Sequence, residues 1–272
     1  MTELLVVIVI ITMLATLTLV GLSAVRKQTR IDQTKQTIQK IHVLLMNKLA
    51  EYETKRVKVT PTKNRTIAAE ERAKAIYDMM RMDMPDRISD LQINDPPVFY
   101  DELTSSARSY KRRIETALGK MIDKEELNDD DCANMSAELL YMIIMRIPNA
   151  AEQFAEFEIG DTNNNGLKEF VDGWGNPIRF LRWAPGINPN DSNLQKHDQH
   201  SPFDPYSGSA LSNYTLYPFI FSAGPDKKPG VNVENEHVFQ GDPYNCDAGK
   251  PLSDDYDDNI TNHNMDYGNM PE

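Results

Sequence analysis

The residues with the clearest chemical pattern lie in one stretch, GDTNNNGLKEFVDGWGNP, which begins at Gly160. Oxygen donors recur there at every second position, which is the ligand spacing of a calcium-binding EF-hand loop. Gly166 falls at the sixth position, where such a loop turns sharply. The predicted calcium ligands, in loop order, are Asp161, Asn163, Asn165, Leu167 through its carbonyl, Glu169 and Asp172.

This loop departs from the EF-hand pattern in two ways. Its twelfth position is Asp172, whereas an EF-hand has a longer, bidentate glutamate there. Gly173, Gly175 and Pro177 follow, so no second helix is expected. We therefore predict a loop followed by a strand, with a weak calcium dissociation constant of about 10⁻⁴ to 10⁻³ M. The alternative is an Asn- and Gly-rich turn held by side-chain-to-backbone hydrogen bonds.

Other kinds of chemistry have little support in the sequence. No Ser/His/Asp or Cys/His arrangement has a recognisable local signature, and the glycines do not form a phosphate-binding loop. The paired carboxylates lie in Asn- and Gly-rich loops, not in apolar surroundings that would raise a pKa. His197 and His200 lie beside Asp and Ser-Pro, where solvated histidines are more common than zinc ligands. We predict neither an enzymatic activity nor a zinc site.

The charge and the cysteines narrow the class of protein further. The chain of 272 residues has a net charge of −12, which argues against nucleic-acid binding because that function needs clustered Lys and Arg. An acidic surface instead attracts divalent cations. Cys132 and Cys246 match no zinc-ligand spacing. They could pair as one disulfide in an exported domain, or remain two thiols.

A long N-terminal helix must position these loops. Leu4 to Val25 contains no charged residue and is long enough to cross a bilayer core of about 30 Å. The polar stretch that follows has no Gly or Pro, and its apolar residues recur at helical spacing. We predict one helix to about Tyr52, with residues 1–25 as a transmembrane helix and residues 26–55 as an exposed half that packs on a domain through one apolar stripe.

The remainder of the chain has two different patterns. Residues 56–150 contain helical patterns, including one over residues 68–84, one capped near residues 104–106 and one with Ser136 as its N-cap. Residues 151–272 form a β-rich domain, in which residues 178–183 and 214–221 are predicted strands. The predicted fold class is α+β: a long N-terminal helix on a small antiparallel sheet, with residues 56–150 as an inserted helical block.

The N-terminal segment ELLVVIVIITMLATLTLVGL resembles the start of type IV pilins and of type II secretion pseudopilins. In that family a leader ends in Gly, and the mature chain begins Phe-Thr-Leu-Ile-Glu-Leu-Leu-Val-Val-Ile. Glu3 falls on the family's glutamate, which is implied to pair with the N-terminal amine of a neighbouring subunit as the helices stack into a filament. The basic leader and its Gly are absent from the sequence as it stands, and two residues rather than four precede Glu3.

The resemblance implies a structural subunit of a pilus or of a type II secretion pseudopilus. It implies a single-pass inner-membrane protein, with its C-terminal domain in the periplasm or at the cell surface, that is extracted into a filament. The implied partners are other pilin or pseudopilin subunits and the inner-membrane assembly machinery. Arg26, Lys27 and Arg30, just after the apolar segment, favour the opposite orientation by the positive-inside tendency.

The resemblance also implies a second calcium locus. The G-type pseudopilins have Ser-x-Gly-x-Asp-Gly after a tyrosine-rich strand and bind calcium between this segment and a second acidic loop. The matching positions in this chain are Ser222, Asp226, Asp257 and Asn259. Two solvated acidic turns are the alternative. For the whole protein, the alternative function is a membrane-anchored calcium-binding surface module that does not polymerise.

Overall fold

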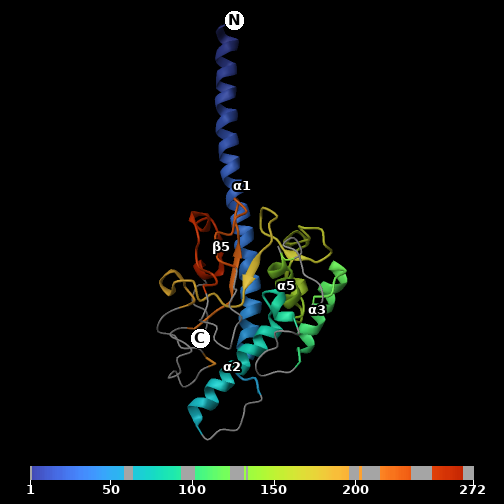
Figure 1. Cartoon of the computed structure of the whole chain (residues 1–272). Helices are drawn as coiled ribbons and strands as arrows, with labels where there is room; N and C mark the ends of the chain where they lie inside the picture. The colour runs from blue at the N-terminus through green and yellow to red at the C-terminus, as the bar shows by residue number, and fades with distance from the viewer. Residues whose placement is uncertain are drawn as a thin grey trace.

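The computed structural model describes residues 2–57, 64–92, 102–122, 132, 134–195, 202–203, 215–233 and 247–265, apart from the side chains of residues 2–6, 15 and 17–20. Figure 1 shows a long helix, α1 (Thr2–Glu51), whose first half stands clear of a domain built from shorter helices and strands. Helices and small antiparallel sheets occur together, which agrees with the predicted α+β class.

Helix α1 is continuous and ends within one residue of the predicted position. Its second half buries one face, since the covered residues follow one another at intervals of three and four. The largest covered side chains there, each at most 4% exposed, are Ile38, Ile41, Leu45, Leu49 and Tyr52. Within the part of the chain that the structure describes, no helix is sufficiently long and apolar to span a bilayer, so the predicted transmembrane half is not supported.

The described residues between 56 and 150 contain α2 (Arg65–Asp83), α3 (Ser105–Leu118) and α5 (Met135–Ile144). Thr104 caps α3, because its hydroxyl accepts a hydrogen bond from the Ala107 N–H at 3.2 Å. The prediction that Ser136 caps α5 is wrong, since Asn134 holds the N-cap position. The Ser136 hydroxyl instead bonds the backbone N–H and carbonyl of Phe180, which ties α5 to a strand.

The strands form two small antiparallel sheets. β1 (Ile159–Gly160) pairs with β2 (Glu169–Phe170), and β4 (Phe219–Ser222) lies between β3 (Arg179–Leu181) and β5 (Ile260–Thr261). β3 falls inside the predicted strand 178–183, while β4 overlaps the end of the predicted strand 214–221 and runs one residue beyond it; both are shorter than predicted. Pro218, which has no N–H to donate, immediately precedes β4. The short 3₁₀ helices are η1 (Ile88–Leu91), η2 (Ala150–Gln153), η3 (Glu156–Glu158), η4 (Pro189–Asp191), η5 (Asp254–Tyr256) and η6 (Asn262–Asn264).

One hydrophobic core joins the helices to the larger sheet. Helix α5 packs against β2 and β3, while α1 packs against β4 and β5. Buried apolar residues of α1, α2, α3 and α5 belong to the same cluster as those of β2, β3 and β4. The described part of residues 56–150 therefore shares its core with the N-terminal helix and the sheet.

Buried ion pairs also connect the helices to the larger sheet. Arg182, just after β3, donates from Nη1 to Asp90 Oδ2 at 2.9 Å, and Arg81 of α2 donates from Nε to Asp90 Oδ1 at 2.7 Å. The Arg182 backbone N–H also donates to Asp86 Oδ2 at 2.9 Å. All four residues are at most 5% exposed. Loss of one partner would leave an uncompensated buried charge, which costs about 3–5 kcal/mol.

Candidate functional site: two acidic loops and the first half of α1

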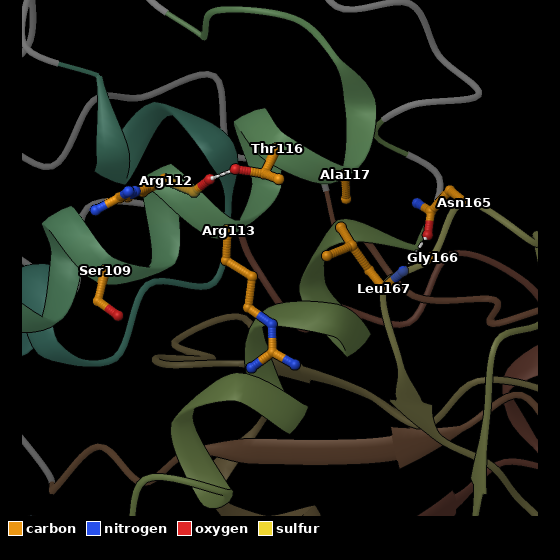
Figure 2. A pocket seen from close by; sticks show the side chains of 8 residues that line it. All are labelled: Ser109, Arg112, Arg113, Thr116, Ala117, Asn165, Gly166 and Leu167. Carbon is orange, nitrogen blue, oxygen red and sulfur yellow. Dashed lines mark hydrogen bonds between the residues drawn. The ribbon is translucent and has the colours of Figure 1, made fainter.

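The first predicted calcium loop is the connection between β1 and β2. Positive φ angles at Asn164 (57°) and Gly166 (88°) let the chain turn tightly. The Asp161 carboxylate accepts hydrogen bonds from the Asn165 N–H at 3.1 Å and the Gly166 N–H at 2.9 Å. Asn165 Oδ1 accepts one from the Leu167 N–H at 2.8 Å, as Figure 2 shows. Side-chain oxygens therefore fold over the loop backbone, which fits both the calcium loop and the alternative Asn/Gly-rich turn.

A carboxylate from outside the loop faces it. Glu138, in the first turn of α5, is fully buried, and its Oε1 accepts hydrogen bonds from Nδ2 of Asn163 at 3.1 Å and of Asn165 at 2.8 Å. Its Oε2 is buried and has no hydrogen-bond partner among the described residues. Burial raises the pKa of Glu138; the two amides lower it, and Glu169 and Asp161 raise it further. Sequence reasoning missed Glu138 because it lies in an apolar helix far from the loop along the chain.

Glu169 secures the base of the loop. It is fully buried, and its Oε1 accepts hydrogen bonds from the Thr162 backbone N–H at 2.8 Å and the Thr162 hydroxyl at 2.5 Å, with Asn134 Nδ2 at 3.3 Å. Its Oε2 is buried and lacks a hydrogen-bond partner in the described ranges. Burial raises the pKa of Glu169, and the nearby Asp161 adds to the rise. Glu169 therefore adds a second buried carboxylate beside the loop.

The structure separates Asp172 from the rest of its predicted ligand set. Its Oδ1 accepts hydrogen bonds from the backbone N–H groups of Trp174 and Asn176, each at 2.8 Å, and its Oδ2 accepts one from the Ser222 hydroxyl at 2.7 Å. The reason is that β2 carries the chain away from the loop in extended form. Asp172 and Ser222, which were assigned to two different loci, are thus joined in one buried hydrogen bond that links a turn to β4.

At the second predicted locus, the predicted ligand Asp257 and its neighbour Asp258 have different surroundings. Asp257 is exposed, whereas Asp258 lies against Gly224, where an added Cβ would be 2.6 Å from the Asp258 carbonyl oxygen. Burial raises the pKa of Asp258, and the nearby Asp226 raises it further. Within the described residues, Oδ1 of Asp258 and Oδ1 of Asn259 are buried without a hydrogen-bond partner. Asp258 therefore lies beside the predicted ligands Asp226 and Asn259, and calcium binding at this locus stays a prediction.

The kind of metal site available is limited by the ligands present. In the described part of the chain, no group of three or more His, Cys, Asp or Glu side chains is arranged to hold a metal ion. A cation held there would use amide and carbonyl oxygens beside one or two carboxylates. Calcium accepts such neutral oxygen ligands, and its affinity falls as the number of charged ligands falls.

A pocket of about 550 Å³ opens between α3 and the first loop. Ser109, Arg112, Arg113 and Thr116 line it from α3, and the loop segment Asn165–Leu167 lines it from the other side. In Figure 2 the Arg113 side chain reaches from α3 into this space. The lining contains two arginines, Arg112 and Arg113, and no His, Asp or Glu.

The domain meets α1 at the middle of the helix. The Gly173 N–H donates to the Thr34 hydroxyl at 2.9 Å, and a Cβ added to Gly173 would lie 2.5 Å from the carbonyl oxygen of Arg30. Before this contact, apolar side chains of α1 have no cover. Those described are between 43% and 63% exposed: Val7, Ile8, Val9, Ile10, Ile11, Met13, Leu14, Leu22 and Val25.

Two other sequence predictions fall partly outside the described residues. Glu3 lies in the first turns of α1, but its side chain is not among those described. Cys132 is half-buried, while Cys246 lies outside the described ranges, so the disulfide between them stays a prediction.

No protein-family model matches this chain, and neither a curated protein nor a solved structure is detectably similar to it. The functional proposal therefore depends on its residues and their geometry.

Proposed function

We propose that the protein is a structural subunit of a pilus or of a type II secretion pseudopilus, and that copies assemble side by side through the first half of α1. The observation that carries the proposal is the contrast within this helix, whose second half is buried against the domain while apolar residues of its first half are uncovered. Contiguous exposed apolar surface marks a site of contact with another protein or with lipid.

The distribution of these side chains favours many neighbours over a single partner. Five consecutive residues, Val7 to Ile11, are 43–58% exposed and apolar. Successive residues of a helix are about 100° apart, so five of them sample its whole circumference. A groove on one partner would cover a single face, whereas a bundle of identical helices covers every face.

Glu3 has a specific role in this arrangement. A carboxylate in apolar surroundings is costly unless it is paired. In the proposed filament, Glu3 pairs with the N-terminal amine of the adjacent copy and thereby fixes the axial offset between helices. Before assembly, the same half of α1 would be held in the inner membrane, with the domain on its far side.

The matched variants Glu3→Ala and Glu51→Ala test the role of Glu3. Glu51 is exposed at the end of α1, so its loss removes the same charge from the covered half. We expect Glu3→Ala to abolish filaments seen by negative-stain electron microscopy after detergent removal, and Glu51→Ala to leave them unchanged. Membrane insertion should be the same in both variants. Filaments of normal abundance with Glu3→Ala would contradict the pairing.

The second candidate function is a membrane-anchored calcium-binding surface module that does not polymerise. It is favoured by the buried, unpartnered oxygens of Asp258 and Asn259 beside Asp226. Replacement of residues 4–25 by an unrelated transmembrane anchor separates the two functions. A module would keep wild-type behaviour after the replacement, whereas a filament subunit would lose assembly.

A further inference from the structure

We propose that the loop containing Asp161, Asn163 and Asn165 binds a calcium ion whose second carboxylate ligand is Glu138, supplied from α5. This inference rests on the calcium binding proposed above and is independent of filament assembly. It assigns the ion to the first loop and adds a ligand that lies outside the loop sequence.

The loop provides the oxygens of a calcium site in the required order. Asp161, Asn163 and Asn165 occupy its first, third and fifth positions, and Gly166 makes the turn at the sixth. Hydrogen bonds from the Asn165 and Gly166 N–H groups hold the Asp161 carboxylate over the loop. This carboxylate is therefore preorganised, which lowers the cost of placing it against an ion.

The loop lacks its own final carboxylate. An EF-hand completes its site with a bidentate glutamate at position 12. Asp172 occupies that position here, but its oxygens bond the turn at residues 174–176 and the Ser222 hydroxyl. A calcium ion in this loop therefore needs a carboxylate from another element.

Glu138 meets that need by position and by its unsatisfied atom. Both asparagine amides of the loop reach its Oε1, at 2.8 and 3.1 Å, so its carboxylate faces the ligand side chains. The residue is 0% exposed, and Oε2 has no hydrogen-bond partner within the described residues. A buried acceptor without a partner is costly, so a cation bound at that atom would relieve the cost.

The asparagine amides can face Glu138 in two ways, depending on whether an ion is bound. Without an ion, their N–H₂ groups donate to Glu138 and partly balance its charge. Rotation of each amide about its last side-chain torsion, which is broad and roughly two-fold, turns the oxygen toward Glu138 and gives up the hydrogen bonds that these oxygens accept from the Asn165 and Leu167 N–H groups. The oxygens of Asn163 and Asn165 would then face the ion together with the Glu138 carboxylate.

The surrounding charges favour a divalent cation. The carboxylates of Asp161, Glu138 and Glu169 all accept hydrogen bonds from residues of this loop, so they lie near one another and repel when ionised. A bound cation offsets this repulsion and favours the ionised form of each group. Glu169, whose Oε1 is bonded to Thr162, acts here as a positioning residue rather than as a ligand.

The proposal is tested by isothermal titration of calcium chloride into the full chain in detergent micelles after treatment with a chelator. We expect a dissociation constant of about 10⁻⁴ to 10⁻³ M for the wild type. Glu138→Gln should weaken binding at least about tenfold, since removal of one charged ligand exceeds the 1.4 kcal/mol that a tenfold change represents. Glu152→Gln, which removes the same charge from an exposed position on η2, should bind like the wild type.

A second measurement separates lost binding from lost folding. In metal-free buffer at neutral pH, Glu138→Gln should melt at a temperature equal to or above that of the wild type, because a buried, partly repelled carboxylate is removed. On calcium addition, the wild type should gain in melting temperature and the variant should gain little. A variant that melts well below the wild type in both buffers would count against a ligand role, because it would reveal a structural one.

The controls distinguish failure of this inference from failure of the proposed function. If Glu138→Gln binds calcium like the wild type while Asp258→Asn does not, the ion belongs to the second locus and the inference is overturned. If the wild type takes up no calcium, the inference and the calcium module are both overturned. Filament assembly, tested separately through Glu3, would be untouched by either result.

Discussion

The two halves of α1 are one continuous helix, yet they have opposite surroundings. In the second half, Ile41 and Leu45 are 0% exposed because the sheet and the shorter helices cover them. In the first half, Ile11 and Leu14 are each 58% exposed. Figure 1 shows the first half standing alone beyond the domain. Among the described residues, the domain therefore covers only the second half of α1, while the first half presents exposed apolar side chains.

The difference can be traced to the arrangement of apolar residues around the helix. The second half mixes apolar and polar residues so that one stripe faces the domain, while polar residues such as Gln39 and Asn47 stay exposed. The first half has consecutive apolar residues and so no polar face. One domain can cover a stripe, whereas several neighbouring helices, or lipid, are needed to cover a whole circumference.

The largest loss of stability should come from a core substitution in the second half of α1, which the domain covers. Leu45→Ala removes a fully buried side chain from the core, and we expect it to reduce the free energy of unfolding by about 2–5 kcal/mol. Urea unfolding of the full chain in detergent, followed by near-ultraviolet circular dichroism, measures the change. A loss below about 1 kcal/mol would mean that the domain does not depend on this half of the helix.

Acid should destabilise the packing of the second half of α1 on the domain, because His42 is buried there. Burial lowers the pKa of His42 to about 4, and its Nδ1 lies 3.1 Å from Asn262 Nδ2 and so must accept as the neutral ring. The unfolded chain binds this proton below about pH 6.5 and the folded chain only below about pH 4. The free energy of unfolding is therefore highest above pH 6.5, and it falls by about 1.4 kcal/mol per pH unit between pH 6.5 and about pH 4.

The matching experiment compares the pH dependence of unfolding in the wild type and in His42→Gln between pH 5 and 7.5. Because His263 is also buried, with a pKa lowered by burial to about 3, the variant should keep part of the slope and lose the part due to His42. Equal slopes in the two proteins would show that His42 does not titrate with folding.

The contact between domain and helix at mid-length should have a smaller effect. Gly173→Ala places a Cβ 2.5 Å from the Arg30 carbonyl oxygen, a backbone atom that cannot rotate away. We expect a destabilisation of about 1–3 kcal/mol, which is typical of overpacking. Gly175→Ala is a useful contrast, since its added Cβ meets nothing within 4 Å and only its positive φ of 83° opposes the change. A Gly173→Ala variant that is as stable as the wild type would contradict a close contact between the domain and α1 at this point.

The smallest effect on folding should come from the uncovered half. Leu14→Ala should change the free energy of unfolding by no more than about 0.5 kcal/mol, because the side chain packs on nothing in the monomer. The same substitution should reduce assembly, which is read as the fraction of protein that sediments as filaments. A large loss of stability in the monomer would mean that Leu14 is covered within its own chain.

The sequence predicted those helix ends that are set by residues close together in the chain. The end of α1 and the cap of α3 at Thr104 depend on neighbours within a few residues, so the sequence was sufficient. Ser136 was misjudged because its hydroxyl bonds Phe180, a residue from a distant strand. The hydroxyl makes two hydrogen bonds to that strand, which outweigh the single bond that a cap would make.

In the candidate sites, too, contacts between residues near in sequence were predicted, whereas contacts between distant elements were not. The turn at Asp161–Leu167 followed from spacing, since its hydrogen bonds join residues two to five apart. The separation of Asp172 and the approach of Glu138 depend on how β2 and α5 pack, which no spacing reveals. The packing of Asp258 rather than Asp257 on Gly224 is a further example, because adjacent residues look alike in the sequence and only their packing distinguishes them.

The most direct test of the central claim is disulfide cross-linking of neighbouring copies through the uncovered half of α1. Cysteine is placed at Leu14 or, as a control, at Leu252, which is 65% exposed on the domain, in a chain whose Cys132 and Cys246 are both serine. After membrane insertion and oxidation, the account predicts cross-linked dimers with Leu14→Cys and few with Leu252→Cys. Equal cross-linking at both positions, or none at Leu14, would contradict assembly through this half of the helix.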